Sequence, residues 1–366
     1  MRMAMNPTRR RFATALAMLP PLWLAAGCAA RAQGLRRDEQ VLLFPSTARS
    51  LPEGGGQARI EAWVHELERR PGATALLAHY LDLDLSELPE TESARFTART
   101  QLFRVDSERG RVLQIRFDGE ALLSLPASGA DGRVSAVVSN GGAAHASDGP
   151  RWLEYAVLMP EEDPRDFAGR VLWLPQAGLS IVSDIDDTIK HTQVRDRREM
   201  LLNTFAREFA AVPGMAAWLQ RCGAAEPAAS FHYVSGGPHQ LYPALAEFLH
   251  AQAFPQGTVH LRSIDLEREI FAAGSGTHTH KLEVIGQLLE DFPQRRFVLV
   301  GDSGEQDPEV YGELARTFPG RIAAIVIRDV TGEPADAERY AQALRDVPPQ
   351  LITLFTDPDR LPADGF

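Results

Sequence analysis

The chain of 366 residues contains only two cysteines, Cys28 and Cys222, and this scarcity argues against a fold held by a framework of disulfides. It is also short of positive charge: the formal net charge is −11, whereas general nucleic-acid binders present a basic face. The same deficit argues against broad adsorption to anionic membranes. After residue 28, no run approaches the roughly twenty apolar residues that span a bilayer. The remaining composition, 44% hydrophobic and 24% charged, is that of a globular protein with two or three domains.

Residues 1–28 predict a targeting segment that is not part of the fold, because arginines precede an uncharged apolar stretch that ends at Cys28. The run 8–12 resembles the twin-arginine export motif, and the run 24–28 resembles a bacterial lipobox, in which the cysteine is acylated. We therefore expect an exported protein of the cell envelope, anchored by lipid at Cys28 to a periplasmic or outer membrane surface. A cleaved signal peptide without lipid, or an uncleaved anchor, are the alternatives.

The region before residue 178 predicts a tether and a small β-rich domain. Residues 29–57 are polar and punctuated by proline and glycine, which indicates a tether with one strand at Val41–Phe44. Residues 58–177 contain short alternating runs separated by turns, which predict a small antiparallel β-sandwich-like domain. Two of these runs, 97–105 and 112–117, predict a hairpin. Packing against the second half of the chain and presenting a substrate both remain open as functions of this domain.

From residue 178 to residue 366 the pattern predicts an α/β domain with a doubly wound parallel sheet. The apolar run 179–183 reads as a buried strand that delivers Asp184 and Asp186 to the edge of the sheet, where ligands of such sheets bind. Two carboxylates separated by a single residue repel one another unless a cation lies between them. An aspartate can also act as a nucleophile that carries a phosphoryl group.

Polar side chains also follow the later strands of this domain. The run 231–234 ends at Ser235 before a glycine turn, and the run 297–300 ends at Gly301-Asp302. With the strand expected at 322–327 and the helices between, this is the β-α-β-α-β order of a doubly wound sheet. Taken alone, Ser235 could be a helix N-cap and Lys281 a solvated side chain at the start of a helix. Acids or hydroxyls at three strand ends instead favour one active site.

In this order the motifs resemble those of the haloacid dehalogenase superfamily of phosphohydrolases, which implies a haloacid dehalogenase-like Rossmannoid fold. The segments 183–192, 233–238 and 299–305 resemble, more narrowly, the catalytic domain of the actin-patch phosphatidate phosphatase family. The motif residues are the pair Asp184 and Asp186 with Thr188, then Ser235 with Gly236, Lys281, and Asp302 with Asp307.

The resemblance implies a role for each of these residues. Asp184 would be the nucleophile and Asp186 the general acid and base. A Mg²⁺ ion would be held by Asp184, Asp302 and the backbone carbonyl of Asp186. Ser235, Gly236 and Lys281 would bind the phosphoryl group, and Asp307 would orient Lys281 or a metal-bound water. Thr188 would stabilise the turn, and Asp187 would have no catalytic role. His191 and His239 are candidates for contact with the substrate.

The expected reaction is hydrolysis of a lipid phosphomonoester such as phosphatidate to diacylglycerol and phosphate. Neither insert between the motifs is long enough for a large α/β cap domain, which leaves the site open to a bulky substrate. The step from phosphatase to phosphatidate depends on the family resemblance. A phosphatase for a soluble phosphomonoester is the alternative, and a lipoprotein that binds without catalysis is a third possibility.

Overall fold

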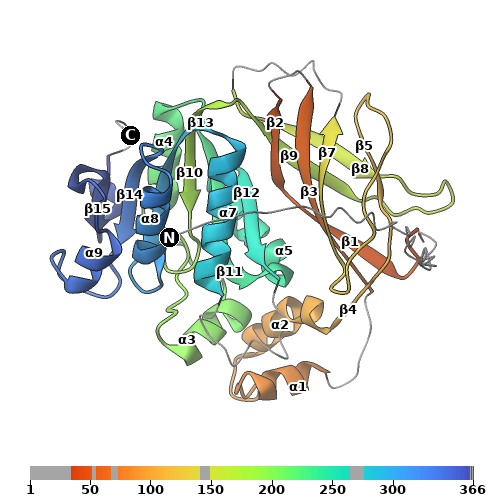
Figure 1. The fold of residues 1–366 in the computed structure, drawn as a ribbon. Coiled ribbons are helices and arrows are strands. Elements are labelled where there is room, and N and C mark those ends of the chain that lie inside the picture. Colours follow the sequence, from red (N-terminus) through yellow and green to blue (C-terminus); the bar gives the residue numbers. More distant parts are fainter. Residues whose placement is uncertain are drawn as a thin grey trace, which may run out of the picture. The chain divides into compact units, whose positions relative to one another are not determined.

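The computed structural model describes residues 34–366 except 52–54, 67–72, 141–148, 264–275, 363 and 365. The predicted signal segment and Cys28 lie outside the described residues. Within the part that is described, no helix has both the length and the apolar character needed to cross a membrane. Residues 32–366 form one compact unit that contains two sheets (Figure 1).

The first half of the chain forms a nine-stranded sheet. Most neighbouring strands are antiparallel, as predicted, but β2 and β9 pair in parallel, so the sheet is mixed. Residues of β3, β5, β8 and β9 share one apolar core, which means that the sheet folds over on itself. The strands are β1 (Glu39–Phe44), β2 (Ser46–Ser50), β3 (Gly56–Glu66), β4 (Asp106–Ser107), β5 (Gln114–Phe117), β6 (Leu123–Ser124), β7 (Arg133–Asn140), β8 (Arg151–Val157) and β9 (Ala168–Leu174).

The strand predicted at Val41–Phe44 is confirmed as β1, but two other local predictions for this half are wrong. Residues 46–50, expected in the tether without a strand, form β2, and both β1 and β2 pair with β3. Residues 97–105, expected as a strand of a hairpin, lie at the end of helix α2 (Glu90–Arg99) and in the turn η1 (Gln101–Arg104). Acidic residues in the first turn of α2 and Arg99 in the last turn favour a helix there through the helix dipole.

The segment between β3 and β4 packs against the second half of the chain. It contains helix α1 (Ala73–Tyr80) and helix α2. Phe96 of α2 is fully buried and lies edge-on to Phe205, with ring centroids 6.2 Å apart. The same apolar core includes residues of the helices that cover the second sheet. This segment therefore belongs to the first half in sequence and to the second half in packing.

The second half forms a six-stranded sheet in which all neighbouring strands are parallel. The strand order is β12-β11-β10-β13-β14-β15, so the chain starts in the middle of the sheet, winds to one edge and returns to the other side of β10. This is the strand order of a doubly wound α/β fold. The strands are β10 (Ala177–Ser183), β11 (Ser230–Pro238), β12 (Gly257–Arg262), β13 (Gln294–Asp302), β14 (Ile322–Arg328) and β15 (Ile352–Phe355).

Helices cover both faces of the parallel sheet (Figure 1). Along β13, Val298 and Val300 pack with α4 and α5, whereas Phe297 and Leu299 pack with α7 and α8. This alternation follows from the two-residue period of a strand. The helices and helical turns are α3 (Arg197–Leu201), the π-helical turn η3 (Leu202–Ala206), α4 (Met215–Ala225), η4 (His239–Leu241), α5 (Tyr242–Ala251), α7 (Thr277–Asp291), α8 (Asp307–Thr317), α9 (Glu338–Ala343), η5 (Pro349–Leu351) and η6 (Pro358–Arg360).

Candidate active site

The carboxyl ends of three neighbouring strands bring the motif residues together. Ser183 of β10 is in register with Tyr233 of β11 and with Val300 of β13. The residues that follow these positions, among them Asp184, Ser235 and Asp302, therefore share one edge of the sheet and are buried there. Between β10 and β13 the strand order reverses, and ligands of open α/β sheets bind at such a switch point.

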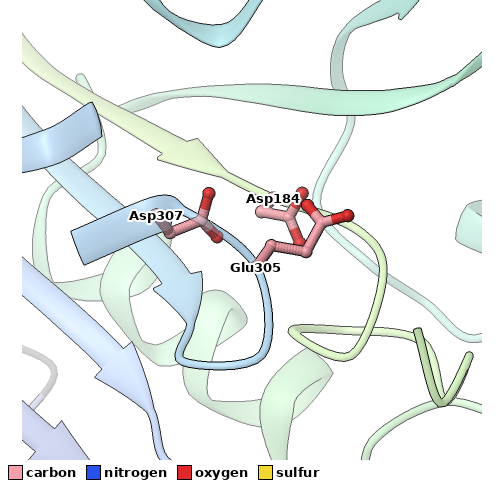
Figure 2. A group of neighbouring side chains, drawn as sticks. All are labelled: Asp184, Glu305 and Asp307. Carbon is pink, nitrogen blue, oxygen red and sulfur yellow. The ribbon is translucent and has the colours of Figure 1, made fainter. Parts of the chain in front are cut away.

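Lys281, near the start of α7, lies among three carboxylates. Its Nζ is 2.8 Å from Asp184 Oδ1 and 2.9 Å from Glu305 Oε2, and it also contacts Asp307 Oδ1. Figure 2 shows how the three acids converge from the end of β10, the loop after β13 and the start of α8. We call these four residues the Lys281 cluster. The carboxylates explain a buried lysine near a helix N-terminus, a position that the helix dipole disfavours.

Gly301 allows this cluster to form. A Cβ atom at Gly301 would collide with the Asp307 side chain, so glycine is required for the close approach of Asp307 to β13. From this position Asp307 Oδ2 accepts a hydrogen bond from the Asp302 N–H at 3.0 Å, while Oδ1 contacts Lys281. Asp307 thus links the Lys281 ammonium to the backbone of the strand that carries Asp302.

Asp184 is held in a strongly unfavourable environment for a negative charge. Burial raises the pKa of the Asp184 carboxyl; the Lys281 ammonium opposes this, and the neighbouring carboxylates of Asp307 and Glu305 raise the pKa further. Oδ1 of Asp184 is paired with the Lys281 ammonium at 2.8 Å, whereas Oδ2 is buried and accepts no hydrogen bond from the described residues. A buried oxygen without a hydrogen-bond donor is destabilising.

The Lys281 cluster fits a divalent cation. One oxygen each of Asp184, Glu305 and Asp307 lies within 4.8 Å of the others, so these three acids could hold a metal ion. Carboxylate oxygens are the ligands that hard divalent ions prefer. Burial, reinforced by Asp307 and Glu305, also raises the pKa of Asp302. An added positive charge would relieve this crowding of carboxyl groups around one ammonium.

The predicted metal ligands overlap only in part with the group formed by Asp184, Glu305 and Asp307. Asp184 belongs to it, but Asp302 lies beside it, where Oδ1 accepts hydrogen bonds from the N–H groups of Gly304 (2.6 Å) and Glu305 (3.2 Å). Asp186 directs its side chain to other partners. The set of Asp184, Asp302 and the Asp186 carbonyl therefore stays a prediction, and Glu305 joins Asp307 as an acid on the metal side of the site.

Asp186 is surrounded by donors. Its Oδ1 lies 2.8 Å from Lys190 Nζ and accepts a hydrogen bond from Thr192 Oγ1 at 2.7 Å, while Oδ2 accepts one from Ser235 Oγ at 2.8 Å. We call these four residues the Lys190 cluster. Burial opposes ionisation, but the Lys190 ammonium and the hydrogen bonds lower the pKa of Asp186 to about 2. Asp186 is therefore a carboxylate and a weak base in this state, so its proton affinity must rise before it can carry a proton.

The turn after β11 presents Ser235 to the site. Ser235 Oγ donates to Asp186 and accepts a hydrogen bond from the Gly237 N–H at 2.9 Å. A Cβ atom at Gly236 would collide with the Thr277 side chain at the start of α7, so a side chain here would push α7 away. Glycine thus keeps the phosphate-binding candidates on β11 and α7 close together.

Asp187 and Thr188 fix the loop after β10. The Asp187 carboxylate accepts hydrogen bonds from the N–H groups of Thr192, Gln193 and Val194 at 2.7–2.8 Å, and its backbone is left-handed, with a φ of 54°. This places Asp187 in support of the loop. The Thr188 hydroxyl lies 3.5 Å from Asp302 Oδ2 and so joins the loop to β13.

The two histidine candidates lie in different surroundings. His239 is buried between the two sheets, against Trp63 and Phe44, and burial together with Arg133 lowers its pKa to about 3. His191 is half-buried and lines a cavity of about 380 Å³ with Asp187 and Arg328. Of the two, His191 is the one placed beside open space.

Three residues of the site were not assigned by the sequence reasoning. Lys190, Thr192 and Glu305 lie inside the segments quoted for the family resemblance, but spacing gave none of them a role. A simple signal could have identified Lys190: the chain has two lysines, at positions 190 and 281, among 38 lysines and arginines. Each of these lysines is buried on one of the two motif aspartates.

An aspartate can carry a phosphoryl group and a lysine can balance the charge of its oxygens, so this site contains the groups that phosphoryl transfer needs. Residues 179–329 match the family model described as phosphatidate phosphatase APP1, catalytic domain. Over 181 residues the chain is 34% identical to phosphatidate phosphatase APP1 of Saccharomyces cerevisiae, which covers 48% of this chain and 30% of that protein. It is also 34% identical over 171 residues to an uncharacterized protein of Schizosaccharomyces pombe, covering 44% of this chain and 26% of that protein.

These matches confirm the predicted resemblance of the second half to an APP1-like phosphatase catalytic domain, and the family suggests a divalent metal. The chain spans less than a third of the length of the curated relatives it matches. A solved 2,6-sialyltransferase of a Photobacterium species aligns over 54% of this chain and 32% of its own at 9% identity. The TM-score of that alignment, 0.21, is too low to indicate a shared fold.

Proposed function

We propose that the chain is a phosphatidate phosphatase of the haloacid dehalogenase type, which hydrolyses a lipid phosphomonoester to diacylglycerol and phosphate. The observation that carries this proposal is the geometry of the acid pair: Asp184 lies 2.8 Å from Lys281 Nζ at the switch point of the sheet, whereas Asp186 is held by Lys190, Thr192 and Ser235. Two neighbouring acids in such different surroundings can take different catalytic roles. The pair lies in the segment that matches the APP1 catalytic domain.

In the first step, an oxygen of the ionised Asp184 carboxylate attacks the phosphorus atom, the bond from phosphorus to the alkoxide breaks, and an aspartyl-phosphate forms. The Lys281 ammonium at Oδ1 favours the ionised form, and Oδ2 accepts no hydrogen bond from the described residues. Lys281 would balance the charge that develops on the phosphoryl oxygens, together with Ser235 and the glycine turn at Gly236.

Asp186 would supply and remove the protons. In the free site it is ionised, so it must take up a proton before it can protonate the leaving alkoxide. A bound phosphoryl group would draw the Ser235 hydroxyl from Asp186, which raises the proton affinity of the carboxylate. In the second step, Asp186 would accept a proton from the water that attacks the aspartyl-phosphate, and phosphate leaves with Asp184 restored.

We further propose Mg²⁺ as the metal, held by Asp184, Asp302 and the Asp186 carbonyl, with Glu305 and Asp307 beside it. When bound, the ion would neutralise charge on the transferring phosphoryl group. The crowding of carboxyl groups around Lys281 supports this part of the proposal.

The test is phosphate release by the full chain from phosphatidate in detergent micelles and from p-nitrophenyl phosphate, with Mg²⁺ or with EDTA. We expect release from phosphatidate that EDTA prevents and that Asp184→Asn abolishes. The exposed residue Asp336 gives the matched control, Asp336→Asn, which should behave as wild type. Wild-type rates in Asp184→Asn would remove the nucleophile, faster turnover of the soluble ester would select a soluble substrate, and no release from either ester would contradict the proposal.

We also propose that Cys28 carries a lipid that holds the protein in the cell envelope. The proposal depends on the lipobox-like run 24–28 in the sequence. Cys28→Ser should move the protein from the membrane fraction to the aqueous fraction, whereas Cys222→Ser should not. Unchanged membrane association of the Cys28 variant would contradict the lipid anchor.

A further inference from the structure

Helix α2 reaches the surroundings of the Lys190 cluster through Arg99. The guanidinium carbon of Arg99 lies 3.6 Å from the centroid of the Phe209 ring. The ammonium of Lys190 lies 5.0 Å from the centroid of the same ring. Phe209 is buried, and a cation over a buried aromatic ring is attracted by its π-electrons. One ring thus connects an arginine of the first half of the chain to a lysine of the active site.

Arg99 also holds the backbone that leads to Phe209. Its Nη1 donates to the carbonyl oxygens of Thr204 (3.0 Å) and Arg207 (2.6 Å), at the end of the π-helical turn η3. Arg95, one turn earlier on α2, donates only to the Ala206 carbonyl, at 3.0 Å, among the bonds described for it. Carbonyls at the end of a helical turn lack partners within the turn, so these donors close it.

The segment that follows Phe209 is paired with the segment that carries Lys190. The His191 N–H donates to the Ala210 carbonyl at 2.8 Å, and the Val212 N–H donates to the Ile189 carbonyl at 2.9 Å. A displacement of residues 209–212 would therefore move Lys190 through its backbone as well as through the ring. Lys190 is 2% exposed and lies 2.8 Å from Asp186, so it has little space in which to adjust.

We propose that Arg99 is a positioning residue for the active site: it fixes Phe209 and residues 209–212, and these hold the Lys190 ammonium against Asp186. The kinetic part of this inference rests on the proposed phosphatase activity, because there Asp186 transfers protons. The segment between β3 and β4 thereby has a function, because it contains α2 and packs this helix against the catalytic half of the chain. Small displacements near reacting groups reduce the catalytic rate strongly.

Because the chain has two lysines, lysine-selective ¹³C labelling of the full chain gives two side-chain NMR signals, assigned with Lys190→Arg and Lys281→Arg. We expect an aromatic ring-current displacement of the Lys190 signal that Phe209→Leu removes. Arg99→Met should reduce the displacement and leave the Lys281 signal in place. Arg95→Met is the matched control: it removes the hydrogen bond to the Ala206 carbonyl but no cation–π contact with Phe209, and it should leave both lysine signals in place. An unchanged Lys190 signal in Arg99→Met would overturn the inference.

Kinetics supply the second measurement. Arg99→Met should lower kcat for phosphatidate about tenfold or more with little change in KM, and Arg95→Met should not. Arg99→Lys keeps a cation for the ring and should restore most of kcat and of the Lys190 signal. In a Lys190→Met background, Arg99→Met should have no further effect on kcat, whereas independent effects that add would overturn the inference. If the wild type releases no phosphate, the proposed function fails, and the NMR comparison still decides this inference.

Discussion

The Lys281 and Lys190 clusters meet at the end of β10, where Asp184 and Asp186 lie, but they differ in charge balance. In the first, one ammonium serves Asp184, Glu305 and Asp307, all largely buried. In the second, one ammonium serves a single carboxylate, Asp186, whose other partners are hydroxyl groups. The first cluster has an excess of acids and the second is balanced, although the two aspartates are separated by one residue.

This difference explains the opposite proton affinities of the two aspartates. In the Lys281 cluster burial dominates and raises the pKa of Asp184, while in the Lys190 cluster the ammonium and the hydrogen bonds outweigh burial and lower the pKa of Asp186. A site with excess buried carboxylates is unstable by itself and gains most from a cation or a proton. A balanced site is complete without a ligand and has to be opened by the substrate.

The largest effect is expected from removing Lys281. Lys281→Met leaves buried carboxylates without their ammonium, and breaking a buried ion pair in this way costs about 3–5 kcal/mol. We expect loss of phosphatase activity and a lower midpoint of urea unfolding, measured by circular dichroism in EDTA. Lys190→Met provides the comparison, because it unpairs one carboxylate that keeps two hydroxyl donors. Equal destabilisation by the two substitutions would contradict the difference in charge balance.

The next effect is on catalysis in the Lys190 cluster. Lys190→Met should lower kcat for phosphatidate by roughly a hundredfold, because the ammonium that holds Asp186 in position is lost. KM should change less, since Lys281 and Ser235 remain to bind the phosphoryl group. Lys190→Arg, which keeps the charge, is the control and should retain more activity. A rise in KM without a fall in kcat would instead assign Lys190 to substrate binding.

The strand-end residues of both clusters could be predicted from the sequence because their signal is local. Short apolar runs that stop at an acid or a hydroxyl locate the edge of a parallel sheet, and the resemblance supplied their order. Glu305 could not be assigned, because it lies in an acid-rich glycine loop where spacing does not show which acid faces Lys281. Lys190 follows the motif in a loop without periodicity, and spacing does not show that its side chain faces Asp186, Thr192 and the Phe209 ring.

The first half was harder to predict because its pairing is not local. Strand β2 pairs with β9, more than a hundred residues away in the chain, and proline and glycine around residues 45–56 made the segment of β2 resemble a tether. The run 97–105 alternates like a strand, yet α2 forms because its buried face packs against η3 of the second half. Tertiary packing overrode the local pattern there.

The smallest expected effect is a change in the free energy of unfolding, and it should have opposite signs for substitutions of Asp186 and Asp184. This difference in sign makes it the sharpest test of the comparison between the two clusters. Above the ordinary pKa of an aspartate, the Asp186 charge stabilises the fold and the Asp184 charge destabilises it. Asp186→Asn should therefore lower the free energy of unfolding at pH 7 by about 2 kcal/mol, since the pKa of Asp186 is lowered from 3.8 to about 2. Asp184→Asn should raise it, because Lys281 keeps Glu305 and Asp307 as partners.

The free energy of unfolding should depend on pH in opposite ways through Asp186 and Asp184. The stabilisation by Asp186 is complete above about pH 4 and is lost as the pH falls toward about 2, where the folded carboxyl takes up its proton. The penalty from Asp184 has the reverse course: it is absent below the pKa of the unfolded chain and grows as the pH rises. The advantage of Asp184→Asn over wild type should thus be largest near neutral pH and shrink toward pH 4. Urea unfolding of wild type and both variants in EDTA from pH 4 to 8 measures this, and destabilisation by both substitutions at pH 7 would show that the two clusters do not differ as argued.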